Sequence, residues 1–206
     1  MSVVLLVRHG QASFGTEDYD RLSPLGEGQA RQLGAALRRT TPTRLVAGSM
    51  RRQEATAKLV ADSAGWTAHL STDPDWNEFD HLRLVGPDAP TDPRAFQAAL
   101  EDAMRRWSGG GQAEETFDAF TNRVSGALAR LTAELGSGDT AVVVTSAGVI
   151  SWLAATLLGG NIEQWIRMNR VCANAAVTKL VAGRQGLSLV SFNEHGHLDA
   201  SAITYR

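Results

Sequence analysis

The sequence has little of what marks several large classes of protein. Cys172 is its only cysteine, which excludes an intramolecular disulfide framework and a cysteine-based metal cluster; we expect a buried structural thiol. No apolar run approaches the length of a membrane span, and the N-terminal run is too short and lacks the basic lead of a secretory signal. A formal net charge of −2 gives no basic excess for nucleic acid or an anionic membrane. We therefore expect a cytoplasmic protein without nucleic-acid or membrane partners.

Signals for metals and cofactors are also scarce. The five histidines show no ligand spacing with carboxylates: His9, His69, His81, His195 and His197. The triplet Gly109-Gly110-Gly111 lacks the lysine and hydroxyl residue of a phosphate-binding loop, so we interpret it as a flexible joint. The five tryptophans lack clustered basic residues and indicate core or rim packing. We expect no metal and no cofactor.

The most informative stretch is the apolar run Val3–Val7, which predicts a buried strand. It stops on Arg8-His9-Gly10. Ligands bind at the carboxyl ends of such strands in open α/β sheets, and a glycine there permits a sharp turn and close approach of a ligand. Arg8 offers a fork of donors for phosphate, and His9 is a candidate nucleophile or base. The alternative is a polar turn in which His9 only bonds a backbone carbonyl.

The remaining pattern alternates strands and helices, which predicts a three-layer α/β/α protein with a mostly parallel sheet. Residues 11–21 read as a loop. Further strands are expected at 45–47, 67–71 and 140–145, with an antiparallel terminal pair at 177–181 and 187–192. Helices are expected at 24–39, 50–64, 93–107, 116–135, 149–158 and 162–169, the first capped by Ser23 and the second ended by Gly65.

The middle of the chain has a different composition. Residues 73–93 are rich in Pro, Asp and Gly and contain Trp76–His81, which indicates an irregular functional loop. The two helices that follow have no strand between them. We therefore expect a single domain over residues 1–206 with a small helical cap inserted at about 73–135.

The order of three motifs resembles the histidine phosphatase superfamily, with its phosphoglycerate mutase-like fold, over essentially the whole length. Arg8-His9-Gly10 ends the first strand, the stretch Leu22–Ala30 opens the first helix, and Ser49–Ala57 opens the second. The resemblance implies a metal-independent phosphomonoester hydrolase in which His9 becomes phosphohistidine. It also implies a phosphorylated small molecule or inorganic phosphate as ligand, and a homodimer as one expected assembly.

The resemblance assigns roles to further residues. Arg8 and Arg52 would bind the phosphoryl group, whose transfer needs preorganised positive charge, while Arg51 would be solvated. Glu78 would act as general acid and then as general base. The neighbouring candidates for that role are Asp75, Asp80 and His81, and we interpret Asp80 and His81 as loop hydrogen-bonding residues.

Two positions depart from the family pattern. Ser146 stands where the family carries a second histidine. A serine hydroxyl can donate to a phosphate oxygen, so we expect Ser146 to bind phosphate in place of that histidine, with a simple turn residue as the alternative. Serine carries no charge, a loss of about 1.5–3 kcal/mol of transition-state binding. His81, His195 or Arg170 are candidates to replace that charge.

The second departure follows the first motif, where mutases of the family carry an acidic residue and an asparagine. Here Gln11 and Ser13 are polar candidates for substrate contact or simple loop residues. We therefore favour a phosphatase over two alternatives, a catalytically impaired phosphate-binding protein and a phosphomutase. The apolar residues around Trp76, Phe79 and Leu82–Val85 hint at a partly apolar leaving group.

Overall fold

The computed structural model describes residues 1–13 and 19–205, so part of the expected loop at 11–21, including Gly15, lies outside the described residues. Within these residues one sheet has six strands in the order β3-β2-β4-β1-β5-β6. Their bounds are β1 Ser2–Arg8, β2 Arg44–Ala47, β3 Leu70–Thr72, β4 Thr140–Thr145, β5 Val177–Gly183 and β6 Gly186–Glu194. The first four strands pair in parallel, and β5 and β6 add an antiparallel edge. The mostly parallel sheet and its antiparallel terminal pair are confirmed.

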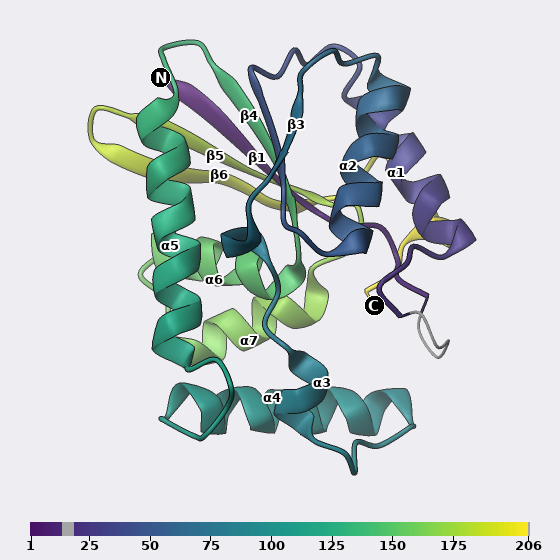
Figure 1. Ribbon diagram of the computed structural model, residues 1–206, viewed down its shortest axis with the longest axis vertical. Coiled ribbons are helices and arrows are strands. Elements are labelled where there is room, and N and C mark those ends of the chain that lie inside the picture. Colours follow the sequence, from purple (N-terminus) through teal and green to yellow (C-terminus); the bar gives the residue numbers. More distant parts are fainter. Residues whose placement is uncertain (14–18, 206) are drawn as a thin grey trace.

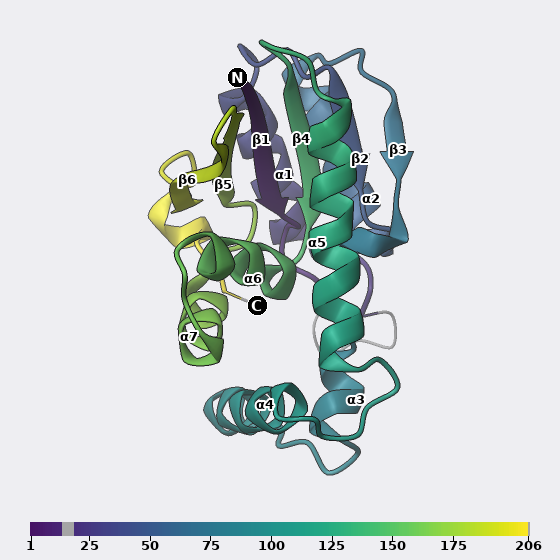
Figure 2. The same cartoon turned by 90° about the vertical axis from the view of Figure 1, so that its left-hand side faces the viewer.

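Helices cover both faces of this sheet (Figures 1 and 2). Side chains alternate along β1: Leu5 and Val7 pack with α1 (Pro24–Ala36) and α2 (Arg51–Ala64), whereas Val4 and Leu6 pack with α5 (Phe117–Glu134) and α6 (Ala147–Leu157). The expected three layers are confirmed. No described helix combines the length and apolarity that a bilayer crossing requires.

The region expected to form a cap divides in two. Helix α4 (Pro93–Ser108) and the short α3 (His81–Val85) lie beyond the carboxyl ends of the parallel strands (Figure 1). In contrast, Val124 and Leu128 of α5 share a core cluster with Val143 of β4, so much of α5 belongs to a layer over the sheet. No strand separates α4 from α5 in the sequence, and from this we expected both helices to belong to the cap. That absence does not tell whether a helix lies in a cap or against the sheet, because a long helix can extend past the end of a sheet.

Residues 67–93 differ locally from the expectation. The strand is β3 at Leu70–Thr72, and the loop contains a 3₁₀ turn at Pro74–Trp76 and the helix α3. An aspartate side chain caps the N-terminus of each short helix. Asp73 accepts from the Asp75 amide (2.9 Å), and Asp80 accepts from the Arg83 amide (3.0 Å). The aspartates that suggest an irregular loop are therefore helix caps.

A cluster of aromatic side chains joins α4, α5, α6 and α7 (Ile162–Val171). Trp107 lies within 5.1–6.4 Å, centroid to centroid, of Phe79, Phe117, Phe120 and Trp165. Trp76, Trp107 and Trp165 are buried, which agrees with the core interpretation. The triplet Gly109–Gly111 closes α4, with the Gly111 amide bonded to the Arg106 carbonyl (2.9 Å), so it is a helix cap where we expected a joint.

Candidate active site

Backbone bonds fix the residues at the end of β1. The His9 amide donates to the Thr145 carbonyl in β4 (2.9 Å), and the Gly10 amide donates to Thr56 Oγ1 in α2 (3.0 Å). We expected Gly10 to permit a sharp turn or a ligand. It instead admits the N-terminal turn of α1, because a Cβ at residue 10 would lie 2.4 Å from the Gly26 carbonyl oxygen. Gly10 is therefore a packing requirement.

Hydrogen bonds hold the buried His9 ring in one tautomer. Nδ1 lies 2.7 Å from the Gly10 carbonyl oxygen, an acceptor, so Nδ1 carries the proton. Arg52 Nε donates to Nε2 at 3.1 Å, which requires a lone pair on Nε2. Burial first, and the nearby Arg52 and Arg8 charges second, lower the pKa of His9 well below its ordinary value. His9 is therefore a neutral imidazole that presents a nucleophilic nitrogen.

Arg8 is buried beside His9, and only part of its guanidinium is hydrogen-bonded. Its Nη1 donates to the carbonyl oxygens of Cys172 and of Tyr205, the latter at 3.1 Å. Its Nε is buried and has no hydrogen-bond partner among the described residues. An orphaned buried donor on a cation is a strong attraction for an anion. Cys172 itself is buried and burial raises its pKa to about 11, so its thiol is a core group, as expected.

Arg52 projects from the first turn of α2 into the site, whereas Arg51 is exposed. Arg52 Nη1 forms a 2.5 Å ion pair with Asp20. The other Asp20 carboxylate oxygen accepts from the Arg51 amide (2.8 Å), and the Tyr19 ring lies 5.5 Å from the Arg52 guanidinium carbon. Asp20 and Tyr19 were missed by sequence reasoning, because a polar loop gives no signal of which side chains return to the site.

Glu78 lies at the N-terminus of α6. Its Oε2 accepts from the Gly148 amide at 2.8 Å. A Cβ at residue 148 would lie 2.3 Å from Glu78 Oε1, so only glycine admits the carboxylate here. Burial raises the pKa of Glu78, outweighing the Gly148 amide and the two arginines, which lower it. A raised pKa suits a general acid.

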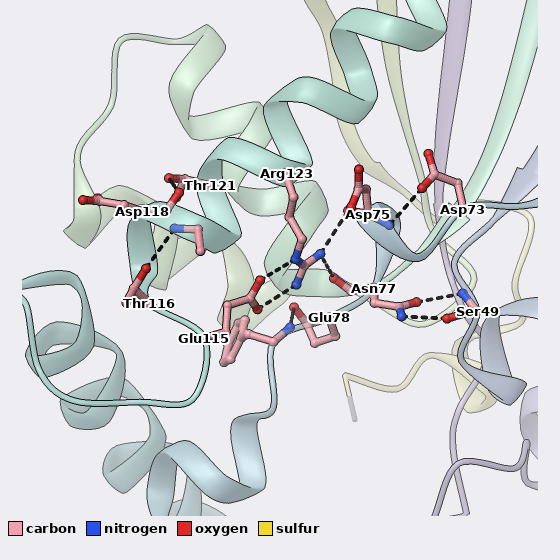
Figure 3. A network of polar contacts seen from close by, with 12 residues as sticks. Ser49, Asp73, Asp75, Asn77, Glu78, Glu115, Thr116, Asp118, Thr121 and Arg123 are labelled. Carbon is pink, nitrogen blue, oxygen red and sulfur yellow. Dashed lines mark hydrogen bonds and ion pairs between the residues drawn. The ribbon is translucent and has the colours of Figure 1, made fainter.

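A network around Arg123 of α5 holds the Glu78 segment (Figure 3). Arg123 Nη1 donates to the carbonyl oxygens of Asp75 (3.0 Å) and Asn77 (2.7 Å), and its other nitrogens bind Glu115 at 2.5 and 2.9 Å. The Asn77 amide group bonds Ser49 across the site (2.7 and 2.8 Å). The Asp75 carboxylate pairs with Arg130, away from His9. Asp75 is therefore not placed as the acid.

Ser146 is buried directly after β4. Its Oγ accepts from Gln53 Nε2 at 2.9 Å, and Gln53 in turn reaches the Trp76 carbonyl (3.4 Å). The hydroxyl is thus tied to α2, and Ser146 does not line the cavity that contains His9. Gln53 is a second residue that sequence reasoning missed.

His9 opens into a cavity of about 100 Å³. Arg8, Arg52 and Glu78 line it. The remaining lining residues come from two loops, from α3, α4, α6 and α7, and from the C-terminal segment: Tyr19, Phe79, His81, Phe96, Gln97, Leu100, Ala147, Asn169, Arg170 and Tyr205. Two of the residues considered as substitutes for the missing charge, His81 and Arg170, therefore line the cavity. His81 also makes a hydrogen bond there, between its Nε2 and the Tyr19 hydroxyl (3.4 Å), as expected of a hydrogen-bonding residue. The third, His195, bonds the Asn193 carbonyl (2.6 Å) and is not in the lining.

The two residues suggested for substrate contact lie elsewhere among the described residues. Gln11 Oε1 accepts from Ser23 Oγ (2.8 Å), the N-cap of α1, and the Ser13 amide pairs with the Arg21 carbonyl (2.8 Å). Neither lines the cavity. The site thus combines a neutral histidine, two arginines and a carboxyl group with a raised pKa, which can bind an anion, attack it and donate a proton.

Comparison with known proteins agrees with this chemistry. The chain is 30% identical over 179 residues to a glucosyl-3-phosphoglycerate phosphatase of Mycolicibacterium vanbaalenii, covering 79% of this chain and 76% of that relative. It is 28% identical over 173 residues to a probable phosphoglycerate mutase of an Enterobacter species, covering 77% and 76%. Among solved structures, YhfR of Bacillus stearothermophilus shares the fold with a TM-score of 0.75 at 17% identity, covering 96% of this chain and 99% of that one.

The two sequence relatives are named as a phosphatase and a probable mutase. A family model extends the match to nearly the whole chain. The model described as the histidine phosphatase superfamily (branch 1) matches residues 4–195, a span that contains His9, Arg52, Glu78 and Ser146. The chain belongs to the histidine phosphatase superfamily.

Proposed function

We propose that this protein hydrolyses phosphomonoesters of small molecules through a phosphohistidine on His9, without a metal ion. The observation that carries the proposal is the His9 tautomer, with its Nε2 lone pair beside Arg52 and the orphaned Arg8 donor. Phosphoryl transfer needs this combination of an in-line nucleophile and fixed positive charge.

The reaction has two steps in this geometry. The His9 Nε2 lone pair forms a bond to phosphorus while the bond from phosphorus to the leaving oxygen breaks, and Glu78 gives that oxygen its proton. The Glu78 carboxylate then takes a proton from water, whose oxygen bonds phosphorus as the nitrogen–phosphorus bond breaks. Inorganic phosphate leaves, and the electron pair returns to Nε2. Arg52 Nε, which donates to His9 Nε2, would donate to the phosphoryl group of a bound substrate.

The test is phosphate release from a panel of phosphomonoesters in the presence of a chelator, for the parent and for His9→Ala. We expect turnover by the parent and a loss of at least about 10³-fold in His9→Ala. Acid-quenched mass spectrometry should find the phosphoryl group on His9. Turnover that persists in His9→Ala contradicts the proposal.

The same assay separates the alternatives. A phosphate-binding protein without turnover is favoured by Ser146, whose hydroxyl is tied to Gln53 and supplies no charge. In that case the parent binds inorganic phosphate but releases none from esters, and Ser146→His gains turnover. A mutase would return the phosphoryl group to a second substrate molecule instead of to water.

A further inference from the structure

The part of the His9 cavity that would receive the leaving group is chemically neutral. Its walls include Phe79, Phe96, Leu100 and Tyr19. Burial and the Arg52 charge lower the pKa of His81 to about 4, so this imidazole is uncharged at neutral pH. Beyond the two arginines that would bind phosphate, Arg170 is the one other cationic side chain in the described lining.

Arg170 is already occupied by a carboxylate. Its Nε and Nη2 donate to the two Glu101 oxygens at 2.6 Å each, a bidentate pair between α7 and α4. The Glu101 side chain is 10% exposed, and it also accepts from Gln97 Nε2 (3.0 Å). The Arg170 side chain is 50% exposed, so its two short bonds to Glu101, rather than burial, hold the guanidinium in place.

We propose that Glu101 sets the substrate class by occupying Arg170, so that the cavity accepts neutral apolar or aromatic leaving groups and rejects those that carry a carboxylate. This inference rests on the proposed phosphatase function. A carboxylate on the leaving group would find the bidentate edge of Arg170 taken and the Glu101 charge beside it. Repulsion between the Glu101 carboxylate and a carboxylate on the leaving group would weaken binding of that substrate.

The Arg170–Glu101 pair lies between the His9 cavity and a second cavity, where it can contact larger substrates. A second cavity of about 440 Å³ shares Gln97, Arg170 and Tyr205 with the His9 cavity and is also lined by Glu101. A leaving group that extends from the inner cavity in this direction passes the Arg170–Glu101 pair before it reaches Arg94, the other cationic side chain in the described lining of the second cavity.

The experiment compares kcat/KM for phenyl phosphate and 4-carboxyphenyl phosphate, which differ by one carboxylate. We expect the parent to prefer phenyl phosphate by about tenfold or more. Glu101→Gln frees Arg170, so the ratio should move by about tenfold or more toward the carboxylate ester. The double variant Glu101→Gln/Arg170→Gln lacks the freed cation and should lose that gain.

The matched control is Glu163→Gln. Glu163 forms the neighbouring pair between the same two helices, with Arg105 at 2.7 and 3.0 Å, and it lies outside both cavity linings. This variant should leave the substrate ratio unchanged. A ratio that changes equally in Glu163→Gln would assign the effect to helix docking and overturn the proposal.

Two further measurements keep the outcome decisive. If Glu101→Gln does not fold, Arg170→Gln replaces it: this variant leaves the Glu101 charge unpaired, so the substrate ratio should move further toward phenyl phosphate, and an unchanged ratio would contradict the proposal. Calorimetry with phenylphosphonate and 4-carboxyphenylphosphonate measures the same preference without turnover. If no ester is hydrolysed but phenylphosphonate still binds more tightly, the proposed phosphatase function is wrong and the role of Glu101 stands. If both phosphonates bind equally, the proposed role of Glu101 in excluding a carboxylate is wrong.

Discussion

At the scale of single residues, the absence of a side chain at Gly148 determines where Glu78 lies. Gly148→Ala would place a methyl group 2.3 Å from Glu78 Oε1, so the carboxylate must move. We expect a fall in kcat of about 10²-fold, because small displacements of a catalytic group are costly. Steady-state kinetics on one phosphomonoester tests this.

Gly28 in α1 is the matched control, because a Cβ there meets no atom within 4 Å. Gly28→Ala should leave kcat unchanged and raise the free energy of unfolding by about 0.5–1 kcal/mol, since alanine favours the helix. Equal kinetics for the two alanine variants would show that Glu78 tolerates displacement and is not the acid.

The pKa values of Glu78 and His9 predict a pH profile. The proposed mechanism requires a protonated Glu78 and a neutral His9, so kcat/KM should fall as pH rises through the raised pKa of Glu78 and as pH falls through the lowered pKa of His9. Glu78→Gln should remove the alkaline limb. It should also lower kcat/KM, which reports the first step, by about 10²–10⁴-fold for an alkyl phosphate and much less for p-nitrophenyl phosphate, because nitrophenolate leaves without a proton. An equal loss of kcat/KM on both esters would argue against proton donation.

At the scale of elements, α5 positions the segment that carries Glu78. Arg123→Met would remove two bonds to the carbonyls of Asp75 and Asn77 and leave Glu115 without its partner. We expect a loss of about 1–3 kcal/mol in the free energy of unfolding together with a lower kcat. Urea unfolding and kinetics on the same preparation measure both.

Arg130, two turns further along α5, provides the comparison. It is 55% exposed and pairs with Asp73 and Asp75 on the same segment. Arg130→Met should leave both the free energy of unfolding and kcat close to those of the parent, because exposed ion pairs contribute little. If both variants behave alike, the segment is held by its own turns and not by Arg123.

The elements and contacts that sequence reasoning found are those with a local signal. Periodicity and capping residues predicted the sheet and its main helices, and motif positions selected Arg52 over Arg51 and Glu78 over its neighbours. What it missed depends on distant partners: Asp20 reaching the Arg52 guanidinium, Gln53 binding Ser146, and α5 lying on the sheet. A single sequence carries no signal for such pairings.

At the scale of the whole molecule, burying neutral histidines links stability to pH. His9 and His81 have lowered pKa values in the folded protein, whereas the unfolded chain takes up protons near pH 6.5. Their contribution is therefore complete above that pH and declines below it, by about 1.4 kcal/mol for each histidine between pH 7.5 and 5.5. Glu78 opposes this trend, because its raised pKa favours the folded state as pH falls.

Denaturant unfolding at the two pH values tests this linkage. His81→Gln should lose about 1.4 kcal/mol less than the parent on acidification. The same substitution at the exposed His69 should leave the difference between the two pH values as in the parent, because that side chain is solvated in both states. An undiminished loss in His81→Gln would mean that His81 is protonated in the folded protein.

The strand order also has a consequence for how the protein is made. β1 is synthesised first, yet both of its neighbours, β4 and β5, come from the second half of the chain. A nascent chain therefore carries β1 as an unpaired apolar strand until β4 and β5 have been synthesised. Such a strand is prone to aggregation and to chaperone binding. His9 follows β1 directly and bonds Thr145 of β4, so it reaches its folded position only after that later strand is in place.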